Sequence, residues 1–229
     1  MTVEAPSSPP PFDVGTLDCY NGRWLEQFDR AEGTDLRLQE EEKQAFDQLV
    51  TAAAAGPRSW GELRYLDVGT CTGRYLAWAV DKGIAAVHGL DCSRQAVAFT
   101  RRRFGTRVHV VEGDIRVEGI GGRLALGDMD LVSIMFGTFN HFSSAQQLVV
   151  LSNLRDCLRI GGSLVVSSWQ PGRCDFSIYD TRQRELLASR GLSPVQLSEL
   201  AAGCGLEVAE WIHTSSKLVA RIRRAARRT

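Results

Sequence analysis

A regular alternation of short apolar runs and helix-like segments, beginning after Gly56–Pro57, is the feature that most constrains the fold. Such an alternation predicts a parallel sheet with helices on both faces. We expect strands at 64–68, 86–90, 108–112, 130–135 and 163–168. The helices between them should begin near Gly73, Ser93 and Ser143, and a later helix should open at Pro194 after the cap Ser193.

Two further patterns complete the expected domain. A stripe of Leu148, Leu151, Leu154 and Leu158 predicts that the helix from Ser143 continues to a stop at Gly161–Gly162. Two runs rich in branched residues, 206–213 and 217–223, are separated by three small polar residues and should pair as an antiparallel hairpin.

The N-terminal quarter of the chain has a different character. Residues 1–13 hold four of the seven prolines and are expected to be disordered. Residues 14–56 show helical spacing of aromatic residues and should form a helical cap, and residues 57–229 should form the main domain. A chain of 229 residues, 44% of them hydrophobic, is long enough for one sizeable core.

The first expected strand ends in the glycine turn Asp67-Val-Gly69-Thr70-Cys71-Thr-Gly73. A glycine turn before a helix lets the backbone approach a ligand and directs helix N-terminal amides at it. A nicotinamide-binding turn would read G-x-G-x-x-G, whereas here Cys71 and Arg74 stand where the later glycines belong. The turn therefore argues against a dinucleotide-binding site.

The same turn resembles the first motif of class I S-adenosylmethionine-dependent methyltransferases, an acid followed by G-x-G-x-G, with Cys71 in place of the middle glycine. The resemblance covers roughly residues 60–223. It implies a seven-stranded, mostly parallel Rossmann-like α/β sheet with helices on both faces, a C-terminal antiparallel hairpin and an N-terminal helical cap. It also implies that S-adenosylmethionine is the cofactor and that Asp67, Gly69, Thr70, Cys71 and Gly73 contact it.

The next two strand ends each carry an acid. Asp91 lies 22 residues after Gly69, the spacing at which a carboxylate can bind ribose hydroxyls. We expect Asp91 and the adjacent Cys92 to contact the cofactor, although Asp91 could instead cap the following helix. By resemblance, Asp114 would meet the adenine amino group and Ile115 would pack on the ring, whereas a simple turn aspartate is the alternative.

The fourth strand runs into a turn rich in aromatic and polar residues, 136–142, at the edge where open α/β sheets bind ligands. The family's fourth motif lies there, so Phe136 is expected at the cofactor and Asn140 and Phe142 at the acceptor. The segment Leu158-Arg-Ile160-Gly-Gly resembles the family's junction between helix and fifth strand, with Ile160 in place of the usual proline.

His141 is the candidate catalytic residue. The other three histidines fall inside expected strands, whereas His141 lies in the strand-tip turn. An imidazole with a pKa of about 6.5 could accept a proton from a hydroxyl or an ammonium acceptor, or orient the acceptor. A purely structural histidine that shapes the turn is the other hypothesis.

Aromatic residues outside the strand tips are candidate acceptor contacts. Tyr20 and Trp24 are spaced as on one helix face, which suits either core packing or a lid. Trp169 and Tyr179 follow the fifth strand in a segment expected to form a second lid wall.

Composition and missing motifs narrow the function. Equal numbers of acidic and basic residues, 27 of each, give no positive field for a nucleic acid. The six cysteines form no C-x-x-C pair, and no acid cluster indicates a metal. No signal-like or membrane-spanning run occurs, so we expect a cytoplasmic protein with no membrane partner. The sequence leaves the oligomeric state undetermined.

The expected activity is N- or O-methylation of a small molecule, with two alternatives. A non-methylating enzyme on the same scaffold would bind the cofactor without consuming it. An RNA methyltransferase would use the basic C-terminus, in which five of the last nine residues are arginine. The absence of an N/D-P-P-Y/F/W run after the fourth strand argues against base amino groups as acceptors.

Overall fold

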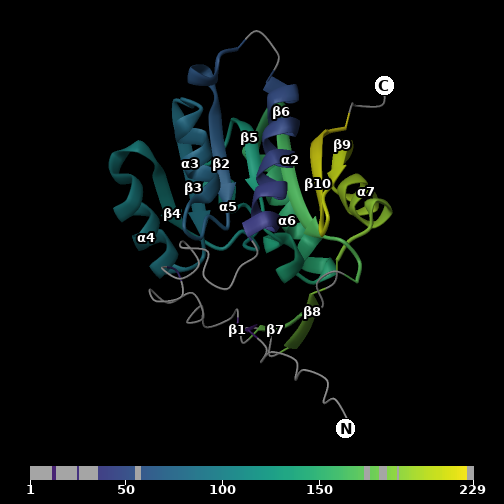
Figure 1. The fold of residues 1–229 in the computed structure, drawn as a ribbon. Helices are drawn as coiled ribbons and strands as arrows, with labels where there is room; N and C mark the ends of the chain where they lie inside the picture. The colour runs from purple at the N-terminus through teal and green to yellow at the C-terminus, as the bar shows by residue number, and fades with distance from the viewer. Residues whose placement is uncertain are drawn as a thin grey trace.

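A computed structural model describes residues 12–13, 25, 36–54, 58–172, 176–180, 185–189 and 191–225. Its centre is a seven-stranded sheet of order β4-β3-β2-β5-β6-β10-β9 (Figure 1). The strands are β2 (Arg64–Val68), β3 (Ala86–Asp91), β4 (His109–Glu112), β5 (Met129–Ile134), β6 (Leu158–Trp169), β9 (Leu206–His213) and β10 (Lys217–Arg224).

The sheet has the mostly parallel topology that the sequence predicts. Strands β4, β3, β2, β5 and β6 are parallel to their neighbours, whereas β10 is antiparallel to both β6 and β9. The expected Rossmann-like fold with a C-terminal antiparallel hairpin is therefore confirmed. Chain order reverses between β2 and β5, and ligands of open α/β sheets bind at such a switch point.

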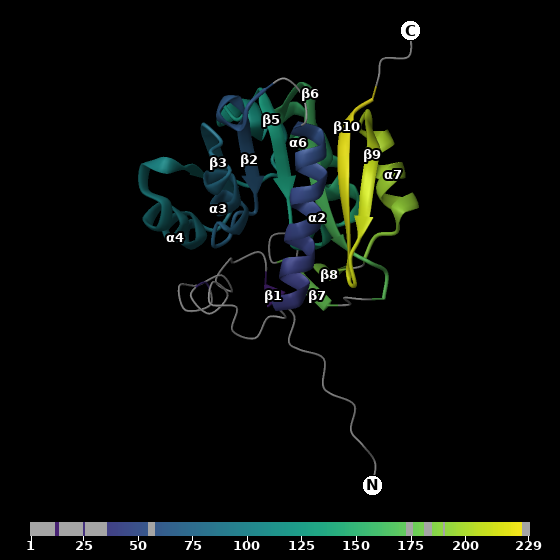
Figure 2. The ribbon, with the colours of Figure 1, turned by 45° about the horizontal axis from the view of Figure 1, so that its top comes forward.

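Six α-helices of the described part cover the two faces of the sheet. One face carries α2 (Leu36–Ala54), α3 (Arg74–Asp81) and α4 (Arg94–Phe104), and α2 lies alongside β10 (Figure 2). The other face carries α5 (Ile120–Arg123), α6 (Ser144–Cys157) and α7 (Pro194–Gly203). Apolar side chains of each helix layer pack on the sheet, so two cores are buried on opposite faces.

Serine caps fix the starts of three helices. The hydroxyls of Ser93, Ser143 and Ser193 accept hydrogen bonds from the amides of Ala96, Gln146 and Gln196 at the starts of α4, α6 and α7. Such caps satisfy amides that lack an intrahelical partner. These starts agree with the sequence prediction.

The predicted end of α6 is wrong. The helix stops at Cys157, and Leu158 already pairs with Met129 of β5 as the first residue of β6. Gly161–Gly162 therefore lie within β6, and Leu148 of the expected stripe is exposed. Pairing with the central strand satisfies the Leu158 backbone and buries its side chain, which outweighs one more helical turn.

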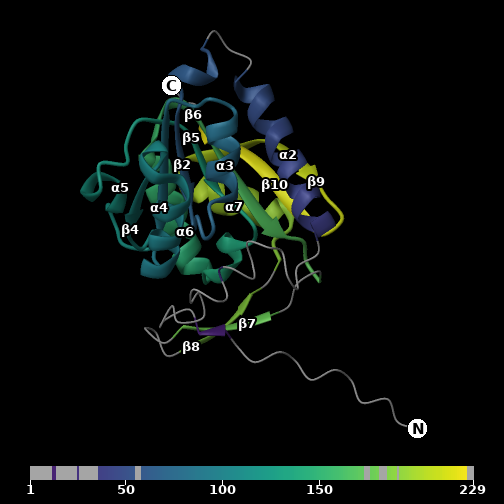
Figure 3. The ribbon, with the colours of Figure 1, turned by 60° about the vertical axis from the view of Figure 1, so that its left-hand side comes forward.

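A small second sheet was not predicted. Strands β1 (Phe12–Asp13), β7 (Phe176–Asp180) and β8 (Glu185–Ser189) form it in the order β1-β7-β8. It lies beyond the carboxyl edge of the large sheet (Figure 3), and β8 approaches the 3-10 turn η4 (Thr138–His141). No helix in the described ranges is long and apolar enough to cross a membrane.

Candidate functional site

The glycine turn between β2 and α3 has a conformation that requires glycine. Gly69 and Gly73 have φ values of +73° and +82°. A Cβ on Gly69 would lie 2.7 Å from Cγ2 of Thr138, and one on Gly73 would lie 2.5 Å from the Phe104 ring. The turn therefore lies directly against η4, so the tips of β2 and β5 form one continuous surface.

Cys71 adopts the left-handed conformation that a glycine would take, with φ of +49°. Its amide donates to Oδ2 of Asp91 at 2.8 Å, and its carbonyl accepts from the hydroxyl of Thr100 at 2.8 Å. These bonds hold a side chain where the related motif has glycine. Burial raises the pKa of the Cys71 thiol, so it stays protonated at neutral pH.

Thr70 carries a buried hydroxyl with open bonding capacity. The residue is 4% exposed, and among the described residues its Oγ1 has no hydrogen-bond partner. Its methyl group lies close to Gly89 of β3. An unpartnered hydroxyl in a glycine turn is a group that a ligand could satisfy.

Asp67 points into the interior between β2 and β5. Its Oδ1 accepts from the Ser133 hydroxyl at 2.7 Å and from the Tyr65 hydroxyl at 3.5 Å. Burial, opposed in part by these hydrogen bonds, raises the pKa of Asp67 to about 7. The expected contact of Asp67 with a cofactor would therefore be indirect, through the strand end that it braces.

Asp91 joins the tips of β2 and β3. Its two oxygens accept from the amides of Cys71 and Ser93, each at 2.8 Å. Burial raises its pKa, and these backbone hydrogen bonds act in the opposite direction. The Cys92 amide also donates to this carboxylate, so of its roughly four acceptor positions about one remains for a ribose hydroxyl. The adjacent Cys92 is half-buried at the same strand end.

Asp114 forms a bidentate pair with Arg116, a partner that was not predicted from the sequence. The guanidinium donates to both carboxylate oxygens at 2.9–3.2 Å. The side chains are only 13% and 16% exposed. Ile115 is buried in the core of the α6 face, so only a small part of it could face an adenine ring.

The turn after β5 is tightly wound and held from two sides. Phe136 and Gly137 both have positive φ, +56° and +76°. A Cβ on Gly137 would overlap Nε1 of Trp169, and the Phe136 and Trp169 rings are 6.4 Å apart. Trp169 at the end of β6 therefore borders this turn.

His141 closes η4 at this edge. It is half-buried, and desolvation lowers its pKa to about 4, so the imidazole is neutral at physiological pH. Neutral imidazole can accept and donate one hydrogen bond each, which suits orienting an acceptor. A pKa so far below 7 makes it a weak equilibrium base.

Asn140 and Phe142 serve mainly in packing. The Asn140 amide donates to the Ser168 hydroxyl at 2.9 Å and accepts from the Trp169 amide at 3.0 Å, which ties η4 to β6. Phe142 packs against the core of the α6 face and forms an edge contact with Phe139. Both residues shape the turn in this structure.

A buried ion pair beside this turn was also missed. Glu42 of α2 and Lys217 of β10 are fully buried and lie 2.5 Å apart. Glu42 is four residues before Phe46 and seven before Leu49, so helical spacing alone could have placed it on the buried face. Lys217, the first residue of β10, gave no indication of its partner.

Other candidates lie outside the described residues or away from the site. Tyr20 and Trp24 lie outside them, and only the backbone of Tyr179 is described, in β7. A cavity of about 560 Å³ between α2 and α3 includes Thr72 and Arg74 but none of the predicted site residues. Within the described ranges, no three His, Cys, Asp or Glu side chains converge as metal ligands, so we assign no metal site.

The strand tips thus bring together two groups of predicted residues. One comprises the turn from Gly69 to Gly73 with Asp91, and the other comprises Phe136, Asn140, His141 and Trp169. The Gly69–Thr138 contact joins the two groups. A cofactor bound over the first group would therefore lie beside an acceptor bound over the second.

Comparison with known proteins agrees with this geometry. A family model described as a methyltransferase domain matches residues 66–162. No curated protein sequence matches the chain significantly. Solved structures do, although at identities that establish the fold alone.

Three of these similar structures are bacterial methyltransferases. A TehB-like S-adenosylmethionine-dependent methyltransferase from Corynebacterium glutamicum is 22% identical, with a TM-score of 0.61, and the match covers 91% of this chain and 98% of that one. CalS10, an amino pentose methyltransferase from Micromonospora echinaspora, is 20% identical, with a TM-score of 0.62 and coverage of 86% and 95%. The Burkholderia thailandensis 1,6-didemethyltoxoflavin-N1-methyltransferase is 19% identical, with a TM-score of 0.63 and coverage of 98% and 94%.

The matched domain contains the glycine turn, both strand-tip acids and the turn after β5, and the sheet around it has the topology of the similar structures. Residues 66–162 thus match a methyltransferase domain, and the chain has the Rossmann-like fold of solved S-adenosylmethionine-dependent methyltransferases.

Proposed function

We propose that this protein transfers a methyl group from S-adenosylmethionine to a nitrogen or oxygen atom of a small molecule. The observation that carries the proposal is the direct contact between the glycine turn and η4 at Gly69 and Thr138. It puts a candidate cofactor surface next to a surface of aromatic and polar side chains. Direct displacement needs this adjacency, because the acceptor must approach in line with the methyl group.

The described residues fit the cofactor. Asp91 retains acceptor capacity for the ribose, and the Thr70 hydroxyl is unpartnered among them. Asp114 would accept from the adenine amino group while keeping its pair with Arg116. We assign cofactor contact to Asp67, Gly69, Thr70, Cys71, Gly73, Asp91, Cys92, Asp114, Ile115 and Phe136, with Asp67 acting through its strand.

The protein's own contribution to catalysis is mainly orientation and exclusion of water. When bound, S-adenosylmethionine supplies an electrophilic methyl group, so few catalytic groups are needed. Neutral His141 would accept a hydrogen bond from an acceptor hydroxyl or amine and so fix the direction of its lone pair. The aromatic border formed by Phe136 and Trp169 would keep water from the reacting atoms.

Small-molecule acceptors are favoured by two observations. The similar structures include enzymes for an amino pentose and for 1,6-didemethyltoxoflavin, both small molecules. The small sheet also lies beyond the carboxyl edge with β8 beside η4, where it would limit the size of an acceptor. We assign acceptor contact to Trp169, with Asn140 and Phe142 shaping the turn that the acceptor would meet, and extend the contact to Tyr20, Trp24 and Tyr179.

The test is a screen for S-adenosylhomocysteine formation with S-adenosylmethionine and a panel of small amines, phenols and hydroxylated heterocycles. Turnover with at least one compound, identified as its methylated product by mass spectrometry, is expected. Cofactor binding without S-adenosylhomocysteine in any reaction would instead support a non-methylating enzyme.

His141 is tested with the acceptor that the screen returns. His141→Asn should bind S-adenosylhomocysteine as the wild type does and lose turnover about 10-fold to 100-fold. Full turnover in this variant would refute the role of His141.

A further inference from the structure

The Glu42–Lys217 pair is the most completely buried charge in the described molecule. Both side chains have zero exposure, and they come from elements far apart in sequence, α2 and β10. A buried ion pair is weak evidence for stability, because apolar residues of similar volume often serve as well. Its presence therefore calls for another explanation.

The surroundings of the pair supply one. One oxygen of Glu42 binds the Lys217 ammonium, and the other accepts from the Phe136 amide at 2.6 Å. The Lys217 ammonium lies 3.5 Å from the centroid of the Phe136 ring and 4.6 Å from that of the Trp169 ring. The pair thus contacts the backbone of one border residue and the rings of both.

Phe136 needs such support. Left-handed backbone in a bulky residue is strained, and it persists only where the surroundings enforce it. A charge-assisted hydrogen bond to its amide and a cation on its ring hold the backbone and the side chain together. The same cation contacts Trp169, so the two rings keep a fixed relation.

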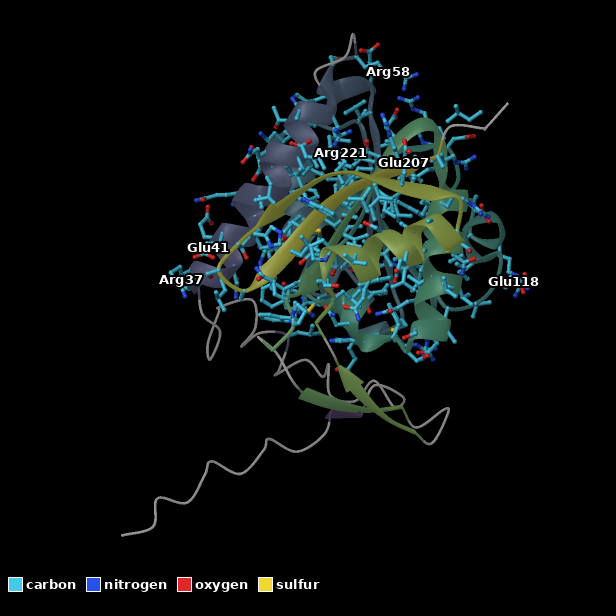
Figure 4. All side chains as sticks on the ribbon, turned by 90° about the vertical axis from the view of Figure 1, so that its right-hand side faces the viewer. Arg37, Glu41, Arg58, Glu118, Glu207 and Arg221 are labelled. Carbon is cyan, nitrogen blue, oxygen red and sulfur yellow. The ribbon has the colours of Figure 1, made fainter. Side chains whose placement is uncertain are left out.

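A neighbouring contact on the same helix offers a matched control. Glu41 accepts from the amide and hydroxyl of Ser215, and Arg37 also binds Ser215, at the β9–β10 turn. Figure 4 shows Arg37 and Glu41 close together at one end of α2. Glu41 therefore attaches the same helix to the same hairpin without touching Phe136.

We propose that Glu42 and Lys217 are positioning residues for methyl transfer, which hold Phe136 and Trp169 in the arrangement that borders the acceptor. The inference rests on the proposed function, which assigns Trp169 to the acceptor and places Phe136, a cofactor contact, on the border between cofactor and acceptor. The buried pair connects helix α2 to Phe136 and Trp169. The predicted cofactor residues on β2 and β3 are not part of this set of contacts.

Hydrogen exchange with mass spectrometry tests the positioning directly, on the full chain with saturating S-adenosylhomocysteine. The variants are Glu42→Gln, the double variant Glu42→Gln with Lys217→Met, and the control Glu41→Gln. The double variant keeps the volume and leaves no unpaired buried charge, so it should fold even if the single variant does not. A neutral amide holds the Phe136 amide less strongly than a carboxylate does.

In the double variant, we expect peptides that cover residues 136–142 to exchange about fivefold to tenfold faster than in the wild type. Peptides that cover 64–68 should keep the wild-type rate in this variant, and all peptides should keep it in the control Glu41→Gln. Wild-type exchange at 136–142 in the double variant would overturn the proposal. Equal acceleration throughout the chain would do so too, because it would mean a general loss of stability.

Kinetics provide the second measurement once the screen supplies an acceptor. The double variant should raise the acceptor KM about fivefold and leave the S-adenosylmethionine KM within twofold. An unchanged acceptor KM, or equal changes in both constants, would contradict a positioning role. Because the exchange experiment needs no acceptor, failure of the methyltransferase assay can be distinguished from failure of this inference.

Discussion

Cys71 occupies a backbone position that favours glycine, and this makes it a sensitive test of the turn. A left-handed backbone destabilises a residue that has a Cβ by about 1–2 kcal/mol. Glycine avoids this strain, but its greater freedom in the unfolded chain lowers the stability by about 0.5–1 kcal/mol. We therefore expect Cys71→Gly to fold within about 1 kcal/mol of the wild type. Its affinity for S-adenosylhomocysteine should be retained.

A branched side chain at the same position should behave differently. Cys71→Val is expected to lose about 1–3 kcal/mol, because a β-branched residue tolerates φ of +49° poorly. Urea unfolding of both variants, with calorimetric titration of S-adenosylhomocysteine, gives the comparison. Equal stability of the two variants would show that the turn is not left-handed at this residue.

Asp67 should make stability depend on pH in an unusual direction. Its pKa rises from 3.8 unfolded to about 7 folded, so the folded state binds more protons between these values. The stabilising contribution is fully present below about pH 3.8 and is lost as the pH rises through about 7. Tyr65, Asp91 and Arg74 are the titratable or charged groups that act on it.

The variant Asp67→Asn removes this titration and keeps an acceptor for Ser133. Its free energy of unfolding relative to the wild type should increase from pH 4.5 to pH 8, by on the order of 2–4 kcal/mol. Urea unfolding without cofactor measures the difference. Asp47→Asn is the control that should show little pH dependence over this range, because the folded pKa of Asp47 is lowered below 3.8 and its carboxylate is ionised in both states. A difference for Asp67→Asn that does not vary with pH would refute the buried-acid assignment.

At the scale of elements, Asn153 of α6 fastens the segment that follows β4. Its amide donates to the carbonyls of Ile115 and Val117 at 2.6 and 3.0 Å and accepts from the Gly119 amide at 3.1 Å. Asn153→Ala would leave these backbone groups unsatisfied, so we expect a loss of about 2–3 kcal/mol.

The same variant should bind S-adenosylhomocysteine more weakly, because Asp114 and Ile115 lie at the start of the fastened segment. Ser152→Ala on the same helix is the matched control and should change neither the stability nor the affinity appreciably. Thermal unfolding measures the stability, and calorimetry measures the affinity for S-adenosylhomocysteine. Wild-type affinity in a destabilised Asn153→Ala would mean that Asp114 and Ile115 do not contact the cofactor.

The elements that the sequence predicts are those coded by local pattern. Runs of apolar residues ended by glycine or an acid give β2, β3 and β5, and serine caps give the starts of α4, α6 and α7. Because parallel strands place their ends at one edge, the same pattern also predicts that Gly69, Asp91 and Phe136 lie near each other.

The parts that sequence reasoning missed depend on distant partners. Lys217 and Glu42 are 175 residues apart, and no local pattern joins them. The strand Phe12–Asp13 exists through its pairing with β7, and Leu158 leaves its helix because β5 offers it a partner. The Asp114–Arg116 pair is local, but an arginine two residues after an acid is too common to be informative.

At the scale of the whole molecule, the site is built from loops that follow four parallel strands, while the two cores lie on either face of the sheet. A ligand that contacts several of these loops binds only the folded chain. Such binding stabilises the protein by about 2.7 kcal/mol when the ligand is at 100 times its Kd.

We therefore expect S-adenosylmethionine and S-adenosylhomocysteine each to raise the thermal midpoint in a concentration-dependent way, and NADH to leave it unchanged. Discrimination against NADH depends on the shape of the turn as well as on charge, because Cys71 and Arg74 stand where a dinucleotide turn needs glycine. Asp91→Asn should reduce the shift with both sulfur ligands, since an amide offers fewer acceptor positions to ribose hydroxyls than a carboxylate. A shift of equal size with NADH would point to a general nucleotide pocket and would contradict the assigned cofactor.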